Sequence, residues 1–230
     1  MLALALIIPT LTLLVSALPA LSPRRGTATT TCASIHIFLA RGTTQSYPGE
    51  MITLAELVIA NNDDADYEDV EYPATWNYAT STKKGYTAMV AQMTSYIDAC
   101  PDAKVVLLGY SQGAHITGDA MCGGGGDGLG SATDPIDSSY MDHVSAVVWY
   151  GDPRNVINLS YDVGTDTTGN GSFPRTEAQL AVCATYADKI HSYCDTNDLF
   201  CASGVSAAVH EGYPDAYDDV AAEWVDSMLA

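Results

Sequence analysis

Three short apolar runs rich in branched residues stand out along the chain, at Ile35 to Leu39, Val105 to Leu108 and Val144 to Trp149. Continuous runs of this length are typical of strands that are buried on both faces of a parallel sheet. A last strand is predicted at Asp188 to Tyr193, and a short one at Val70 to Tyr72, ahead of a proline. The pattern therefore predicts a parallel sheet of about five strands.

Between and after these runs, apolar residues recur at helical spacing. One set begins after Tyr86 and comprises Met89, Val90, Met93 and Ile97. A second set near the C-terminus comprises Tyr217, Val220, Ala221, Trp224, Val225 and Met228. Both predict amphipathic helices that cover a sheet. With 230 residues and 47% hydrophobic content, we expect a single three-layer α/β domain of the hydrolase-like kind, with helices on both faces of the sheet and no cap domain.

Two segments without such periodicity are expected to be loops. The acidic stretch from Asn61 to Glu71 invites a calcium-loop interpretation, but Asp69 stands where an EF-hand-type loop needs glycine. A solvated surface loop is favoured there. Gly123 to Gly126 lacks the following Lys-Ser or Lys-Thr of a phosphate-binding loop and is expected to be a flexible loop.

The N-terminus has the pattern of an export signal. An apolar run from Leu2 to Val15 precedes small residues that suit a cleavage site, so we assign residues 1–17 to a signal peptide. Residues 18–31 are then a propeptide or N-terminal tail, with Arg24-Arg25 either a processing site or an ordinary exposed pair, and residues 32–230 the catalytic domain. Because no positive charge precedes the apolar run, a short membrane anchor remains an alternative.

The cysteine count and the net charge indicate in which compartment the protein resides and which partners are disfavoured. The six cysteines are an even number, which in an exported chain predicts three disulfides, with 15 connectivities open. Their spacing does not match a structural zinc site, so no metal is expected. Sequons at Asn158 and Asn170 allow glycans on a eukaryotic secretory route. A net charge of −19 disfavours nucleic acid and stable association with anionic membranes.

The strongest chemical motif follows the buried run at Val105 to Leu108. It reads Gly109-Tyr110-Ser111-Gln112-Gly113 and precedes a predicted helix from Ala114 to Met121. A serine flanked by glycines at such a junction is typical of a nucleophile on a tight strand-to-helix turn, where side chains at the flanking positions would clash. Ser111 is therefore the candidate nucleophile.

A serine nucleophile needs a base, and the base needs an acid that orients it. In folds of this class the acid and the histidine follow the serine in that order, which excludes His36. Among the later histidines, His210 is preceded by suitable acids and lies in a predicted loop, whereas His115, His143 and His191 are expected to be structural. Asp198 lies between Cys194 and Cys201, directly after the last predicted strand, and Asp195 is its competitor within that segment.

Together, the Gly-Tyr-Ser-Gln-Gly motif, the Asp between two cysteines and the histidine nine residues after the second cysteine resemble the cutinase and fungal acetylxylan esterase family. The resemblance spans nearly the whole chain after residue 31 and favours Asp198 as the acid. It implies an oxyanion hole formed by the backbone N–H groups of Thr43 and Gln112, with the Thr43 hydroxyl as a further donor. It also implies the disulfides Cys32–Cys100 and Cys194–Cys201, which leaves Cys122–Cys183.

The resemblance further implies a secreted, monomeric serine esterase without a cofactor that acts on an ester substrate, expected to be polymeric. Segments such as Cys122 to Gly125 and His210 to Tyr213 look closer to the acetylxylan esterase branch than to cutinases, which remain the alternative. A wall-binding or effector protein without catalysis is a second alternative. Tyr110 and Tyr213 are the candidate substrate-binding residues, although for Tyr213 and Tyr217 packing of the last helix is the favoured interpretation.

Overall fold

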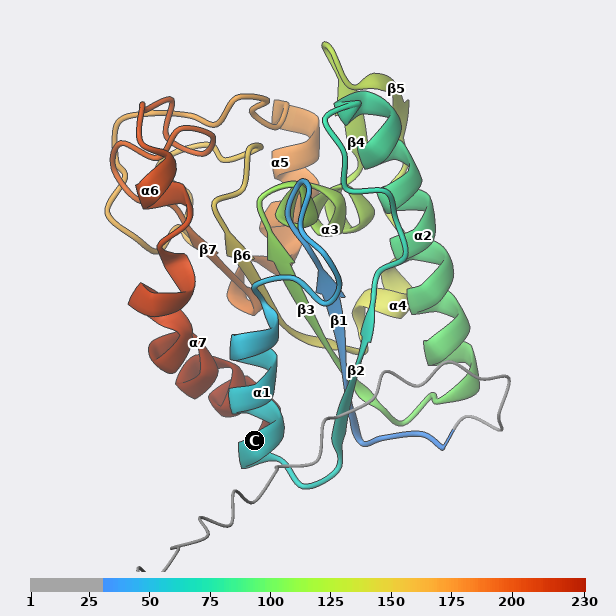
Figure 1. Ribbon diagram of the computed structural model, residues 1–230. Coiled ribbons are helices and arrows are strands. Elements are labelled where there is room, and N and C mark those ends of the chain that lie inside the picture. The colour runs from blue at the N-terminus through green and yellow to red at the C-terminus, as the bar shows by residue number, and fades with distance from the viewer. Residues whose placement is uncertain (1–30) are drawn as a thin grey trace, which may run out of the picture.

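We analysed a computed structural model, which describes residues 31–230. The expected signal peptide, and nearly all of the expected propeptide or tail, lie outside the described residues. A five-stranded sheet forms the centre of the molecule, with all neighbouring strands parallel and the order β2-β1-β3-β6-β7 (Figure 1). The strands are β1 (Ile35–Ala40), β2 (Ala65–Asp69), β3 (Lys104–Tyr110), β6 (Val144–Tyr150) and β7 (Ile190–Tyr193).

Helices cover both faces of this sheet, as the apolar pattern predicts. One face packs against α1 (Ile52–Asn61) and α7 (Tyr213–Leu229), and the other against α2 (Tyr78–Ala99) and α3 (Gln112–Cys122). Short helices α4 (Ser138–Met141) and α5 (Glu177–Cys183) lie on the side of α2 and α3 (Figure 1). Alternate residues of each central strand enter opposite cores: Val105 and Leu107 face α2 and α3, whereas Val106 and Leu108 face α1 and α7. This explains why these strands are apolar throughout.

The strand order places a binding site at a definite position. From β1 the chain adds β2 on one side, and from β3 it adds β6 and β7 on the other, so the direction of winding reverses between β1 and β3. In open α/β sheets, ligands bind beyond the carboxyl ends of the strands at such a point. The segments after β1 and β3 carry Thr43 and Ser111, and both lie at the end of the sheet that is uppermost in Figure 1.

Three disulfides stabilise the layers: the two pairs that the family resemblance implies and the third pair that these two leave. Cys32–Cys100 joins the start of β1 to the end of α2, and Cys122–Cys183 joins α3 to α5. Cys194–Cys201 closes a small ring after β7.

The two segments that were predicted to be loops, 61–71 and 123–126, each contain a strand. The acidic stretch contains β2. The strand predicted at Val70 to Tyr72 is wrong, because β2 ends at Asp69 and those residues follow it outside any strand. An edge strand has one neighbour and keeps its side chains partly exposed, so it can carry the acidic residues that the apolar pattern excludes. Gly124–Gly126 (β4) pairs antiparallel with Gly130–Thr133 (β5), a ribbon held by backbone hydrogen bonds rather than by apolar side chains.

Candidate active site

The turn at Ser111 has the strained geometry that its flanking glycines predict. Ser111 adopts φ 54° and ψ −116° between β3 and α3, a conformation that an L-residue rarely occupies. A Cβ atom on Gly113 would lie 1.8 Å from the carbonyl oxygen of Ala40, and one on Gly109 would lie 2.7 Å from Cα of Ala114. Only glycine fits at either position, because the turn presses α3 against the ends of β1 and β3.

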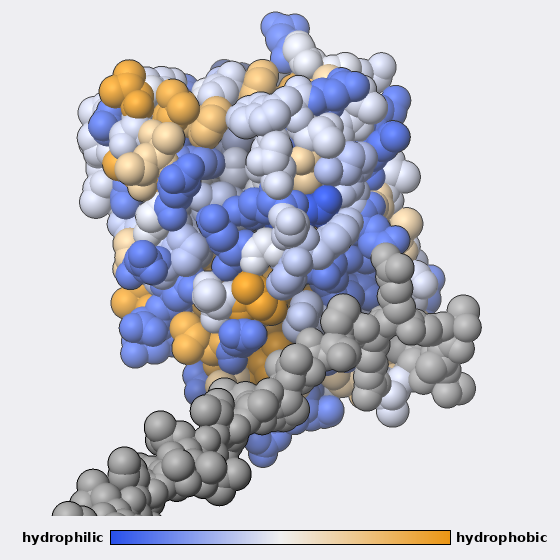
Figure 2. All heavy atoms as spheres, viewed as in Figure 1, coloured by the Kyte–Doolittle hydropathy of each residue, from blue (hydrophilic) through white to orange (hydrophobic). Residues whose placement is uncertain are grey.

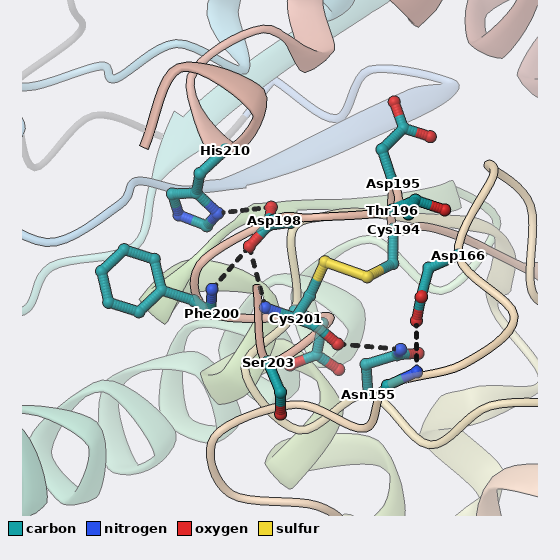
Figure 3. The surroundings of a disulfide bond; sticks show 12 residues. Asn155, Asp166, Cys194, Asp195, Thr196, Asp198, Phe200, Cys201, Ser203 and His210 are labelled. Atoms are coloured by element: carbon teal, nitrogen blue, oxygen red, sulfur yellow. Dashed lines mark hydrogen bonds and ion pairs between the residues drawn. A yellow bond between two sulfur atoms is a disulfide. The ribbon is translucent and has the colours of Figure 1, made fainter. Parts of the chain in front are cut away.

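His210 and Asp198 form a buried pair on the loops that follow β7. His210 ends the one-turn helix α6 (Ala207–His210), a correction to the predicted loop. Its Nδ1 lies 2.8 Å from Oδ2 of Asp198, and both side chains are buried. Figure 3 shows the imidazole facing Asp198 beside the disulfide ring that contains this carboxylate. The ring orients Asp198 toward His210, whereas Asp195 accepts hydrogen bonds from Thr165 and Tyr217 instead.

Four donors surround the carboxylate of Asp198. Its Oδ1 accepts the backbone N–H groups of Phe200 at 2.6 Å and Cys201 at 2.9 Å, as Figure 3 shows. Its Oδ2 accepts the hydroxyl of Tyr213 at 2.7 Å in addition to His210. Burial favours the neutral acid, but the interactions with His210, Cys201 and Tyr213 outweigh it and hold the pKa of Asp198 below its ordinary value. Asp198 is therefore an anion at neutral pH.

Ser111 and His210 both lie against the end of β6. The N–H of Ser111 donates to the carbonyl of Tyr150 at 2.8 Å, and a Cβ atom on the next residue, Gly151, would lie 2.7 Å from Cε1 of His210. The hydroxyl of Tyr110, which precedes the serine, donates to the carbonyl of His210. The serine turn and the imidazole thus contact the same short segment, so three distant parts of the chain converge here.

Thr43 and Gln112 lie together beside the serine turn. The side-chain amide of Gln112 donates to the hydroxyl oxygen of Thr43 at 3.1 Å and to the carbonyl of Thr75 at 3.2 Å. Its amide oxygen accepts the hydroxyl of Ser81 at 2.7 Å. Within residues 31–230, no hydrogen bond uses the backbone N–H of Thr43 or of Gln112. The Thr43 hydroxyl accepts from Gln112, so its own proton is also available to a ligand.

Tyr110 and Tyr213, the candidate substrate-binding residues, are buried. They are 3% and 1% exposed, respectively, and their hydroxyls donate inward, to His210 and Asp198. This burial supports a packing role for both rings, and contact with substrate stays a prediction. For Tyr213, packing was the favoured interpretation, and its hydrogen bond to the acid adds a role that no local motif indicates.

The other histidines have structural surroundings. His115 is fully buried next to Asp119, and His191 stacks on Trp224 with ring centroids 3.7 Å apart. Buried ion pairs that sequence analysis did not identify follow β6: Arg154 pairs with Asp119 at 2.9 Å, and Arg175 with Asp152 at 2.5 Å. The first pair joins the segment after Gly151 to α3, which carries the serine turn at its start, and the second joins Asp152 to the residue before the N-cap of α5. The sequence Gly151-Asp152-Pro153, directly after the apolar strand β6, is the local signal that could have indicated these ion pairs.

Comparison with known proteins decides the family. The family model described as Cutinase matches residues 31–229. The chain belongs to the cutinase family. Relatives in this family include an acetylxylan esterase of Hypocrea jecorina, 38% identical over 86% of this chain and 68% of the relative. Cutinase 11 of Verticillium dahliae is 35% identical over 86% of this chain and 70% of that protein.

Solved structures agree with this membership. The catalytic core domain of acetyl xylan esterase from Trichoderma reesei superposes with a TM-score of 0.80 at 37% identity, covering 86% of this chain and 99% of that domain. The fold is thus the α/β hydrolase fold of acetylxylan esterases and cutinases, and the chain is a carboxylic ester hydrolase. In residues 31–230, no group of three or more His, Cys, Asp or Glu side chains is arranged to hold a metal ion. The same residues include no helix long and apolar enough to cross a membrane.

Proposed function

We propose that this chain is a secreted serine esterase that removes acetyl groups from acetylated xylan, with Ser111, His210 and Asp198 as its catalytic triad. The observation that carries the proposal is the convergence of the strained serine turn with a buried imidazole whose Nδ1 is held by a carboxylate. That hydrogen bond leaves Nε2 as the nitrogen that exchanges protons with the serine. Export is supported by the three disulfides, which persist in oxidising compartments.

The reaction proceeds through an acyl-enzyme. Oγ of Ser111 attacks the carbonyl carbon of the acetyl ester while Nε2 of His210 takes the hydroxyl proton. As the tetrahedral intermediate collapses, the bond to the sugar oxygen breaks and His210 returns the proton to that leaving oxygen. Water then attacks the acetyl-serine with His210 again as the base, which releases acetate and restores Ser111. Asp198 stays ionised throughout and stabilises His210 when it is charged.

The negative charge of each tetrahedral intermediate develops beside Thr43 and Gln112. Their backbone N–H groups have no other hydrogen-bond partner in the described part of the chain, and the Thr43 hydroxyl is oriented by Gln112 to donate. Donors fixed in this way need no rearrangement when the charge appears, and loss of one such donor typically costs roughly 3 to 4 kcal/mol of transition-state stabilisation. The side-chain bonds of Gln112 to Thr75 and Ser81 keep this arrangement rigid.

Acetate as the acyl group is supported by the confined site. Ser111 is 8% exposed and His210 6%, so only a small part of either residue is accessible from solvent. Relatives named as acetylxylan esterases support the same substrate. A cutinase activity is the second candidate. It is favoured by exposed apolar side chains at Leu199 and Val205, on the loop that continues from Asp198, and by the relative Cutinase 11.

A two-part experiment tests the proposal. Ser111→Ala should abolish most hydrolysis of p-nitrophenyl acetate, and undiminished turnover by this variant would refute the triad; absence of activity in the unmodified protein would favour the non-catalytic alternative. The unmodified enzyme should release acetate from acetylated xylan and prefer acetyl over butyryl or longer p-nitrophenyl esters. The reverse preference, with no acetate released from xylan, would identify a cutinase.

A further inference from the structure

Trp76 is an exposed aromatic side chain that the catalytic mechanism does not use. It is 67% exposed, whereas Trp149 lies fully in the core and Trp224, which is partly buried, stacks on His191. Among the described residues, Phe200 is the only aromatic ring recorded against it, with centroids 6.4 Å apart. Large aromatic side chains are usually buried, because they gain much free energy on leaving water, so an exposed indole that contacts a second aromatic ring beside the candidate triad is a candidate for ligand contact.

The position of Trp76 connects it to one side of the active site. The preceding residue, Thr75, accepts the side-chain amide of Gln112 through its carbonyl at 3.2 Å. The N–H of Thr75 donates to Ser81 at 3.0 Å, and Ser81 in turn donates to Gln112. The backbone that carries the indole is therefore fixed to the residue that follows Ser111.

Phe200 belongs to the opposite side. Its N–H donates to Asp198, and its ring packs edge-on against His210 with centroids 4.6 Å apart. In Figure 3 the ring of Phe200 lies beside the imidazole of His210. Trp76 and Phe200 thus extend from the oxyanion side and the histidine side, respectively, and approach each other next to the candidate triad.

We propose that Trp76, with Phe200, forms a platform that stacks one neutral pyranose ring of the polysaccharide, next to the ring that carries the scissile acetyl group. The proposal rests on the proposed esterase function and names a carbohydrate-binding subsite for it. A pyranose presents C–H groups on its faces, which are attracted to the electron-rich face of an aromatic ring. Its hydroxyls lie at the edges, where the exposed neighbours Thr75 and Asn77 supply polar groups.

The surface pattern favours a sugar over an apolar polymer at this platform. The exposed aliphatic residues Leu199 and Val205 belong to the loop between Asp198 and α6, and Figure 2 shows apolar side chains gathered over that part of the molecule. An aliphatic polyester would contact those residues, whereas the residues on either side of Trp76 in the sequence, Thr75 and Asn77, are polar and exposed.

A binding titration in the Ser111→Ala protein tests the platform independently of catalysis. Xylohexaose is added while tryptophan fluorescence is recorded, and Trp76 should give a saturable change because Trp149 is buried and Trp224 is stacked on His191. Replacing Trp76 by Ala in this protein should weaken binding by about tenfold in calorimetry, which corresponds to about 1.4 kcal/mol. Trp76→Phe should lose the fluorescence change but retain part of the affinity. Val205→Ala is the matched control and should bind as before.

Kinetics supply a second readout with Ser111 intact. Trp76→Ala should raise KM for acetylated xylan by about tenfold and leave kcat/KM for p-nitrophenyl acetate within about twofold, because the small ester does not reach the platform. Unchanged affinity of the Ala variant for xylohexaose would overturn the proposal, and so would weakened binding to polyester particles with xylohexaose binding unchanged. An equal loss on both esters would place Trp76 in the support of the oxyanion side and reject the platform.

The test of the Trp76 platform can fail or succeed independently of the test of the proposed esterase function. If Ser111→Ala retained esterase activity, the triad would be wrong, but the xylohexaose titration would still decide whether Trp76 binds sugar. Conversely, loss of activity in Ser111→Ala with no effect of Trp76 on xylohexaose binding would leave the esterase in place and remove the subsite.

Discussion

Replacement of Tyr213 by Phe tests how the acid of the candidate triad is held. The hydroxyl of Tyr213 donates to Oδ2 of Asp198 at 2.7 Å and accepts the N–H of Asp195 at 2.9 Å. Burial, followed by the charge of Asp198, raises the pKa of Tyr213, so the hydroxyl stays protonated and donates at every pH at which the protein is folded. Tyr213→Phe removes only this hydroxyl and keeps the ring in the core.

The magnitude follows from the charge and burial of Asp198. A hydrogen bond to a buried charged group contributes roughly 1.5 to 3 kcal/mol, and Asp198 would keep three of its four donors. We therefore expect the free energy of unfolding at pH 7 to fall by about 2 kcal/mol. For a domain of this size, that lowers Tm by about 4 to 8 °C. Because two backbone N–H groups still hold Oδ1, kcat should fall by no more than about tenfold.

The effect depends on pH with a definite sign. The folded-state pKa of Asp198 lies below its unfolded value of about 3.9, so its ionised form stabilises the fold above that pH. This stabilisation is lost as the pH falls through the folded pKa. Tyr213→Phe raises the folded pKa, so the difference between the variant and the unmodified protein should be complete at pH 7 and shrink below about pH 4.

Urea denaturation at pH 7 and pH 3 measures the difference directly. Tyr217→Phe is the matched control, since this hydroxyl on the same helix donates to the partly exposed Asp195 at 2.7 Å. The control should lose less than about 1 kcal/mol, because water replaces the missing donor. An equal loss for Tyr213→Phe at both pH values, or no loss at pH 7, would show that the hydroxyl does not stabilise the anion of Asp198.

Three further sets of substitutions test the turn, the proposed oxyanion donor at Thr43 and the disulfide ring. Gly113→Ala places a Cβ atom 1.8 Å from the carbonyl oxygen of Ala40 and should cost more than about 3 kcal/mol in denaturant unfolding; a folded variant with normal stability would contradict the geometry. Thr43→Val should lower kcat by about 10²- to 10³-fold while Thr43→Ser retains most activity, and equal rates for the two would exclude the hydroxyl as a donor. Replacing Cys194 and Cys201 together by Ser should lower the free energy of unfolding by about 2.5 kcal/mol and reduce kcat; unchanged kcat would mean that the ring does not orient Asp198.

Sequence pattern alone predicted the parts of the fold that depend on burial. β1, β3 and β6 are continuous apolar runs because both of their faces are covered, and α2 and α7 carry one apolar face each. β2 was missed because its sequence, Ala-Asp-Tyr-Glu-Asp, is stabilised by backbone pairing with β1 rather than by an apolar face. The start of α2 was also placed too late, since its first turn is packed by polar contacts such as Ser81 with Gln112.

The candidate site could be predicted where its chemistry requires a local sequence. The glycines around Ser111 reflect a steric condition that lies within five residues, and the short spacing of Cys194 and Cys201 frames Asp198. The hydrogen bond from Tyr213 and the contact between Trp76 and Phe200 join segments that are not adjacent in the chain. No periodicity or motif indicates these contacts, because they depend on how the loops beyond the sheet pack.

Some residues of this site are held by many hydrogen bonds and others are exposed. This difference suggests which residues determine the ester specificity. Asp198 and Gln112 are fixed by several buried hydrogen bonds each, so changes there would disturb the proposed catalytic steps. Trp76 and Val205, in contrast, are largely exposed and can change at little cost in folding free energy. Proteins named as an acetylxylan esterase and as a cutinase are similarly related to this chain, at 38% and 35% identity. We infer that the exposed segments on the two sides of the site, rather than the buried groups, set which polymer is bound.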